Sequence, residues 1–410
     1  MNILVIGNGF DLAHGFPTRY IDFLQFLYYV KDGIDYIDES RSGDLDFYLL
    51  DKKSEMNHNK LNTSLIEFIE SFLYKYSDNQ LTQNEYKTIE IVKDNLWINY
   101  FTNDIVINDA ISKGWIDFEN YISSIVKTLN NDLDEVIKLE SIVAKELEAS
   151  DYELRYMGKI FYCLYNKKNN IDYLYLLLAS RASKYNNDFD LFELFKNCKI
   201  DEHYYKKYII KPLDDDLNKF SCVLEFYLDS FINNLTSKSI PLFKSLNVDC
   251  ILSFNYTNTY NRFYDKENLK TYHYIHGKSH KNSIFNSNIV LGIDDYLIGN
   301  DANEKIDFIR FKKYFQRIHK KTGSQYKVWL NTDAKNNIYF FGHSLDITDK
   351  EILNELIMNP NSTSFIYYCD DEMNAQQISN LVRVIGKSNL LDKVSSLTPS
   401  IYFKSFTKNI

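Results

Sequence analysis

Apolar residues follow two different periods along the chain. Residues 2–6 are a short, mostly β-branched apolar run that ends at Gly7, and such a run before a tight turn predicts a buried strand. Similar runs occur later, at 250–254, 272–275, 289–291, 338–341, 365–368 and 401–403. Helical patterns separate several of them, which predicts strand–helix–strand units of a parallel sheet.

The middle of the chain has the spacing of helices. Apolar residues recur at intervals of three and four, first at residues 20–27 and then at Leu61, Leu65, Phe68, Ile69, Phe72 and Tyr76 and at Leu217, Phe220, Leu224, Leu228, Phe231 and Leu235. Between residues 44 and 276 the only glycines are Gly114 and Gly158, and no proline lies between Pro17 and Pro212. Residues 30–245 are therefore predicted to be mainly helical.

These patterns predict an α/β fold, a Rossmann-like doubly wound parallel sheet interrupted by a large helical insertion. We expect residues 1–30 and 246–410 to form one discontinuous domain and residues 31–245 to form the insertion. The insertion either carries regulation or completes the core. Ligands of such sheets bind at the carboxyl ends of the strands, so the residues that follow the apolar runs are the candidates for chemistry.

Composition narrows the function. The chain has 410 residues, 45% of them hydrophobic and 25% charged, and a net charge of −9. This content suits a soluble protein with a full core, and the negative charge argues against a large nucleic-acid-binding face. A basic cluster is interpreted as a solvated helix face; it comprises Arg310, Lys312, Lys313, Arg317, Lys320 and Lys321.

Cysteine usage and apolar runs point to one compartment. The five cysteines are far apart and odd in number, which supports neither a zinc ribbon nor a disulfide framework. No run approaches 18 apolar residues, and the N-terminus lacks the features of a signal peptide. We expect a cytoplasmic protein without a membrane partner or a bound metal.

The first predicted strand leads into Gly7-Asn8-Gly9-Phe10-Asp11. Small residues at such a place let backbone N–H groups approach a phosphate. The dinucleotide fingerprint expects a third glycine where Leu12 stands, and Gly15 comes later. The pattern alone is equally consistent with a structural turn.

The whole stretch 7–20 resembles the nicotinamide-dinucleotide loop of the sirtuin superfamily, with three glycines and Pro17 in register. Asp11 replaces the family serine, and residues 18–20 replace its Asp-Phe-Arg. Three more segments are similar to sirtuin segments and follow the family's order. They are Asn255-Tyr256-Thr257, His276-Gly277 and Gly342-His343-Ser344-Leu345.

The resemblance implies NAD as the substrate. It implies dinucleotide contacts from Gly7, Asn8, Gly9, Phe10, Gly15, Pro17, Thr18, Thr257, Gly342, His343 and Ser344. Cleavage of the nicotinamide–ribose bond passes through an oxocarbenium-like state and needs a ribose partner and a base. Asn255 would orient the ribose or a water, His276 would act as the base, and Asp11 would stabilise positive charge. The alternatives are a purely structural His276 and an Asp11 that caps a helix.

Together with residues 115–119, Trp-Ile-Asp-Phe-Glu, these segments make the chain similar to the bacteriophage abortive-infection AbiH family. This resemblance implies an anti-phage role. Sirtuin deacylases carry a four-cysteine zinc ribbon, and no Cys-x-x-Cys occurs here, so hydrolysis of NAD to nicotinamide and ADP-ribose is the leading hypothesis. Such an enzyme has to be held inactive until a phage-derived trigger or assembly into a homo-oligomer activates it.

Several alternatives stay open. The pocket could sense a nucleotide without turnover, or His273, His276 and His280 with Asp294 and Asp295 could form the metal site of a nuclease. The second is disfavoured because His273 and His276 face opposite sides of a strand. A Ser344 nucleophile is weaker still, because its segment has no Gly-x-Ser-x-Gly elbow.

Two segments have paired interpretations. Residues 346–349 are predicted to begin a helix at 350–358, capped by Asp346 or Thr348, or to face the ribose. Residues 115–119 either begin a helix or bring a carboxylate into the pocket.

Overall fold

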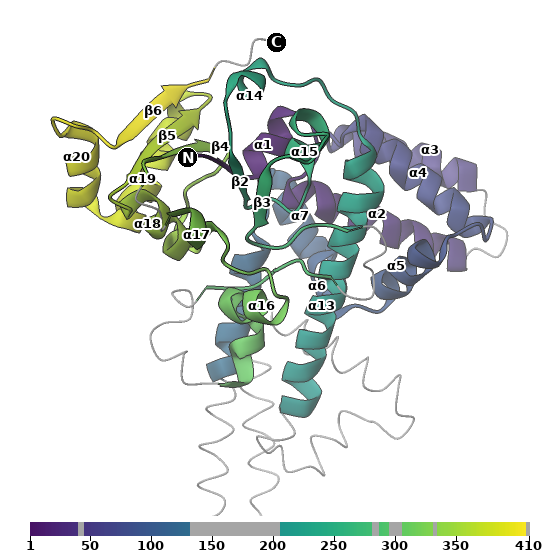
Figure 1. Ribbon diagram of the computed structural model, residues 1–410. Coiled ribbons are helices and arrows are strands. Elements are labelled where there is room, and N and C mark those ends of the chain that lie inside the picture. Colours follow the sequence, from purple (N-terminus) through teal and green to yellow (C-terminus); the bar gives the residue numbers. More distant parts are fainter. Residues whose placement is uncertain (40–44, 132–205, 281–286, 295–305, 331–333, 407–410) are drawn as a thin grey trace, which may run out of the picture.

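The computed structural model describes residues 1–39, 45–131, 206–280, 287–294, 306–330 and 334–406 (Figure 1). Its described strands form one parallel sheet in the order β3-β2-β1-β4-β5-β6. They are β1 (Asn2–Ile6), β2 (Cys250–Ser253), β3 (Thr271–Tyr274), β4 (Asn336–Phe341), β5 (Ser362–Tyr368) and β6 (Ile401–Ser405). This is the strand order of the Rossmann fold. The predicted α/β class with a parallel, Rossmann-like sheet is therefore confirmed.

Both faces of the sheet are covered, as the uninterrupted apolar run of β1 predicts. Ile3 and Val5 pack into a core with the helices that follow β3, whereas Leu4 and Ile6 pack into a second core on the other face. The first core is formed with α17 (Tyr326–Leu330), α18 (Lys350–Met358), α19 (Asp371–Ile385) and α20 (Lys387–Ser395). The second is formed with α1 (Asn8–Ala13), α14 (Pro241–Ser245) and α15 (Thr259–Tyr264).

A helical layer lies beside the sheet (Figure 1) and has a third apolar core. It contains α2 (Tyr20–Glu39), α3 (Leu45–His58), α4 (Thr63–Ser77), α5 (Gln83–Lys93), α6 (Leu96–Phe101), α7 (Asp104–Lys113), a helix at 118–131 and α13 (Lys211–Phe226). The predicted helical character of the middle is confirmed for these described residues. Helix α2 passes residue 30 without a break, and the domain boundaries stay a prediction.

Residues 289–291 are not a strand, contrary to the prediction. The backbone N–H and C=O of Leu291 bond to the side-chain amide of Gln316, each at 3.0 Å. Ile289 and Leu291 are buried in the core of the helical layer. A short apolar run indicates burial, but it does not show whether a strand or a side chain satisfies its backbone.

In the described part of the chain, no helix is long and apolar enough to cross a membrane.

Candidate functional site

The loops that follow β1 and β4 touch through glycines. The Gly9 N–H donates to the Gly342 carbonyl at 2.8 Å, and the Gly7 N–H donates to the Phe341 carbonyl at 3.1 Å. A Cβ on Gly9 would lie 2.6 Å from the Gly342 Cα, closer than such atoms can approach. These two N–H groups are thus bonded within the protein, and the two glycines let the loops pack closely. Their contacts with a dinucleotide stay a prediction.

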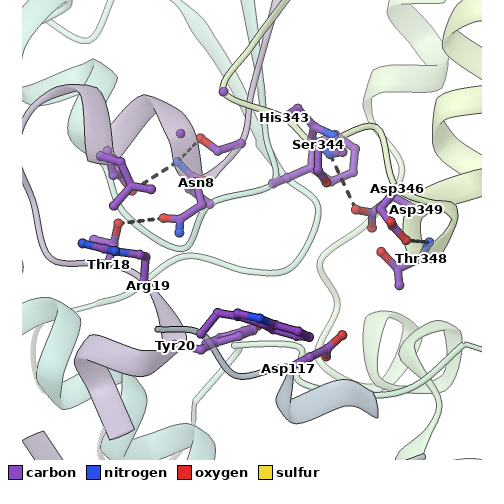
Figure 2. A pocket seen from close by; sticks show the side chains of 18 of the residues that line it. Asn8, Thr18, Arg19, Tyr20, Asp117, His343, Ser344, Asp346, Thr348 and Asp349 are labelled. Carbon is purple, nitrogen blue, oxygen red and sulfur yellow. Dashed lines mark hydrogen bonds and ion pairs between the residues drawn. The ribbon is translucent and has the colours of Figure 1, made fainter. Parts of the chain in front are cut away.

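A cavity of about 1050 Å³ lies at the carboxyl ends of the central strands, at the upper end of the range for ligand pockets. Among the predicted site residues, those that line it are Gly7, Asn8, Gly9, Asp11, Thr18, Asn255, Thr257, His276, Gly342, His343 and Ser344. Figure 2 shows Asn8, Thr18 and Arg19 on one side and His343 and Ser344 across from them. Segments from both ends of the chain therefore build one cavity.

Three predicted contacts are not brought to the cavity. The Phe10 ring packs against Phe243 with ring centres 4.9 Å apart. Gly15 adopts a left-handed turn with φ of 80°, and the Pro17 carbonyl accepts a bond from the Tyr227 hydroxyl at 2.7 Å. These residues shape the loop after β1 but do not line the cavity.

Asp11 is a buried carboxylate on α1, with 1% of its surface exposed. Its Oδ2 accepts bonds from Asn255 Nδ2 at 3.1 Å and from Thr257 Oγ1 at 2.6 Å, whereas Oδ1 has no partner among the described residues. Burial outweighs these bonds and raises the pKa of Asp11 to about 6. The helix-cap alternative is wrong, because Gly7 occupies the N-cap of α1.

His276 lies beside Asp349, and both side chains line the cavity. Its Nε2 lies 3.1 Å from Asp349 Oδ1, and its buried Nδ1 has no partner among the described residues. Burial lowers the pKa of His276, and Lys313 and Arg317 lower it further against the effect of Asp349. The ring is therefore neutral at neutral pH, and with Nε2 as the donor to Asp349 the lone pair is on the unpartnered Nδ1.

Asp349 is shared by two histidines. His343 Nε2 lies 3.5 Å from its Oδ2 (Figure 2), and the Leu345 N–H donates to His343 Nδ1, which places the proton of a neutral His343 on Nε2. Burial alone would raise the pKa of Asp349, but Lys313 and the two histidines lower it well below its usual value. A permanent anion thus orients both rings.

Lys313 is buried in the cavity wall and pairs with Glu119, with 2.8 Å between Nζ and Oε2. Burial raises the pKa of Glu119 to about 7 even though Lys313 lowers it. The solvated-face interpretation of the basic cluster is therefore wrong at Lys313. Segment 115–119 was predicted either to begin a helix or to bring a carboxylate into the pocket, and it does both. A helix starts at residue 118, and Glu119 lines the cavity.

The histidines of the metal hypothesis do not converge. His273 bonds to the Thr322 carbonyl, His276 to Asp349, and His280 lies beside Glu225. Asp295 lies outside the described residues. Within the described ranges, no group of three or more His, Cys, Asp or Glu side chains could hold a metal ion.

The sequence did not single out Asp349 or Lys313 as site residues. Asp346 caps the turn at 347–349, accepting the Thr348 N–H at 3.2 Å, and helix α18 follows as predicted. Asp349 itself makes no side-chain cap bond and is left to contact the histidines. Asp349 follows a turn that Asp346 already caps, so its carboxylate is not needed as a cap. A second acidic residue of this kind at a helix start is the signal that could have identified Asp349.

Replacing Asp11 with asparagine is expected to make stability less dependent on pH. The folded chain holds the Asp11 proton up to about pH 6, whereas the unfolded chain releases it near pH 4, so wild-type stability falls as the pH rises between these values. The variant escapes this loss of about 3 kcal/mol at most. Urea unfolding at pH 5 and pH 8 measures the part of this loss that falls above pH 5, about 1.4 kcal/mol. A stability difference between the two proteins that is the same at both pH values would contradict the prediction.

A comparison with protein families gives one match. A family model described as bacteriophage abortive infection AbiH matches residues 3–368. Neither curated proteins nor solved structures give a significant match to the chain.

Proposed function

The chain belongs to the bacteriophage abortive-infection AbiH family, and we propose that it acts in this defence by hydrolysing NAD⁺ to nicotinamide and ADP-ribose. The family assignment supports the anti-phage role and covers both the segment after β1 and the segment after β4. The reaction is our inference from the cavity. The sirtuin resemblance supports it and stays a hypothesis.

The observation that carries the proposal is the unpaired Nδ1 of His276 in the same cavity as the Asp11–Asn255 pair. Departure of neutral nicotinamide breaks the bond between its ring nitrogen and ribose C1′ and leaves an oxocarbenium-like ribose. A water attacks C1′ and gives its proton to His276 Nδ1, while Asp349 stabilises the charged ring. Asn255 is held by its amide nitrogen and presents its carbonyl oxygen to a ribose hydroxyl or to the water.

The charge of the cavity suits a cationic reacting centre. Its lining contains the carboxyl groups of Asp11, Asp117, Glu119, Asp346, Asp349, Asp370 and Glu372, against the cations of Arg19, Lys313 and Arg383. An excess of carboxylates stabilises both the positively charged nicotinamide ring and the positive charge that develops on the ribose. Phosphate groups would bind to side-chain donors such as Arg19 and Thr18.

The decisive experiment follows nicotinamide release from NAD⁺ by purified protein, alone and with lysate from phage-infected cells. We expect release by the wild type, a large loss in His276→Gln, and little loss in the control His273→Gln, whose ring lies outside the cavity. Absence of release in both conditions would contradict the hydrolase. Binding without release would instead support the nucleotide sensor.

Trp115 offers a binding measurement that needs no turnover. It lines the cavity and is 59% exposed, whereas Trp97 and Trp329 are buried. Occupation of the cavity by NAD⁺ is expected to quench the exposed indole and change the emission at saturation. The change should disappear in Trp115→Phe. A ligand-induced change that persists in this variant would place the nucleotide elsewhere.

A further inference from the structure

Lys313 occupies a position that is electrostatically unfavourable for a positively charged side chain. It is the first residue of α16 (Lys313–His319), and a cation at a helix N-terminus is opposed by the helix dipole. Its side chain is only 4% exposed. Its N–H donates to the Ile293 carbonyl at 3.0 Å, so the backbone holds the residue in this place.

Glu119 contacts its ammonium group at 2.8 Å, and Asp349 and Asp294, from other segments, act on it by charge. Burial would lower the pKa of Lys313, but Glu119, Asp349 and Asp294 together raise it above its usual range. Glu119 belongs to the helical layer, and Asp349 follows the strand β4 of the sheet. One buried cation thus pairs with a carboxylate of the helical layer and acts by charge on the carboxylate that orients His276.

We propose that Lys313, held by Glu119, is the positioning residue through which the helical layer controls the His276–Asp349 pair. Its charge stabilises the Asp349 anion and opposes protonation of His276, and loss of the Glu119 contact would change both. The regulatory meaning of this link rests on the proposed function, whereas the link itself can be measured without substrate.

Several charged and titratable groups act on the pKa of His276, and a test has to distinguish the effect of Lys313 from the effects of the others. Asp349 contacts the ring directly and is shared with His343, and Tyr256 lies beside it. Lys313 and Arg317 act on it by charge. Glu119 and Asp294 act on Lys313. Replacing Lys313 removes the positive charge that pairs with Glu119 and leaves the side chains of His276 and Asp349 unchanged.

The first test is an NMR titration of the His276 ring in substrate-free protein, with the signal assigned from its absence in His276→Gln. In Lys313→Met we expect the pKa of His276 to rise by about one pH unit or more. The control is Lys320→Met. Lys320 is also a buried lysine and follows the end of α16, but its Nζ donates to the Ile289 carbonyl and it does not line the cavity. A His276 titration in Lys313→Met that equals the wild type would overturn the proposal.

Glu119 is tested by a double-mutant cycle. Glu119→Gln should shift the His276 titration in the wild-type background and leave it unchanged in the Lys313→Met background. A residue that is merely structural would lower the unfolding temperature without this dependence. Equal shifts in both backgrounds, or none in either, would show that Glu119 does not act through Lys313.

A charge-reversed double variant keeps the test open if Lys313→Met fails to fold. Glu119→Lys combined with Lys313→Glu preserves an ion pair and places a negative charge beside the site, so the pKa of His276 should rise further than in Lys313→Met. A folded double variant with a wild-type titration would contradict the proposal. A shifted titration in a protein that never cleaves NAD⁺ would retain the link and reject the hydrolase.

Discussion

Gly342→Ala is expected to destabilise the protein by about 3 kcal/mol or more. Gly342 has φ of 65°, and an added Cβ would lie 2.2 Å from the Phe10 nitrogen and 2.4 Å from the Gly9 carbonyl carbon. Both neighbours are backbone atoms, which cannot move aside as a flexible side chain can. Urea unfolding monitored by circular dichroism measures the loss.

The matched control is Gly114→Ala. Gly114 has φ of 71° but meets no atom within 4 Å of an added Cβ, so it isolates the cost of the left-handed conformation, about 1–2 kcal/mol. The excess loss in Gly342→Ala then reports the contact between the two loops. Equal losses in the two variants would show that this contact contributes nothing to stability.

The architecture of the sheet was predictable because burial on both faces leaves a local pattern. The central strands β1 and β2 are short apolar runs that end at polar or glycine residues, and each can be recognised from its own sequence. The edge strands β3 and β6 are only partly buried and carry a weaker form of the pattern. The segment 289–291 shares the pattern and fails for a non-local reason. The side chain of Gln316 satisfies the backbone of Leu291 in place of a strand, and nothing in the segment itself specifies that partner.

The candidate site was predictable only in part. Asn255 and His276 come two residues after a strand, and Asp11 lies in the short helix after β1, so the topology brings all three to one edge of the sheet. Lys313 and Asp349 begin helices, and their burial depends on how the helical layer packs. Local pattern favours a solvated or capping role for such residues, because the compensating charges come from distant segments.

Gly7 and Gly9 were predicted as positions of close approach, and in the structure the atoms that an added Cβ would meet belong to the loop after β4. A phosphate and a second backbone loop impose the same steric requirement, since both exclude a Cβ. In this chain the second loop is present, because the Gly342 carbonyl accepts the Gly9 N–H. Two glycine-containing loops at adjacent strand ends are thus as consistent with mutual packing as with ligand binding.

Asp349→Asn is expected to lower kcat for nicotinamide release by about 10²–10⁴-fold with a small effect on KM. Asparagine can still accept the His276 Nε2–H, but it lacks the negative charge that stabilises the imidazolium once Nδ1 has taken a proton. Initial rates over a range of NAD⁺ concentrations separate kcat from KM. Thermal unfolding recorded alongside shows that the variant is folded at the assay temperature.

Asp346→Asn is the matched control for this charge. Asp346 lines the same cavity three residues earlier and caps the turn by accepting the Thr348 N–H, a bond that asparagine makes equally well. We expect a much smaller loss of kcat than in Asp349→Asn, because Asp346 contributes only to the overall charge of the cavity and does not contact His276. An equal loss in both variants would mean that the negative charge of the cavity as a whole, rather than the contact between Asp349 and His276, supports the reaction. A wild-type rate in Asp349→Asn would remove His276 from the role of base, because its orienting anion would then be dispensable.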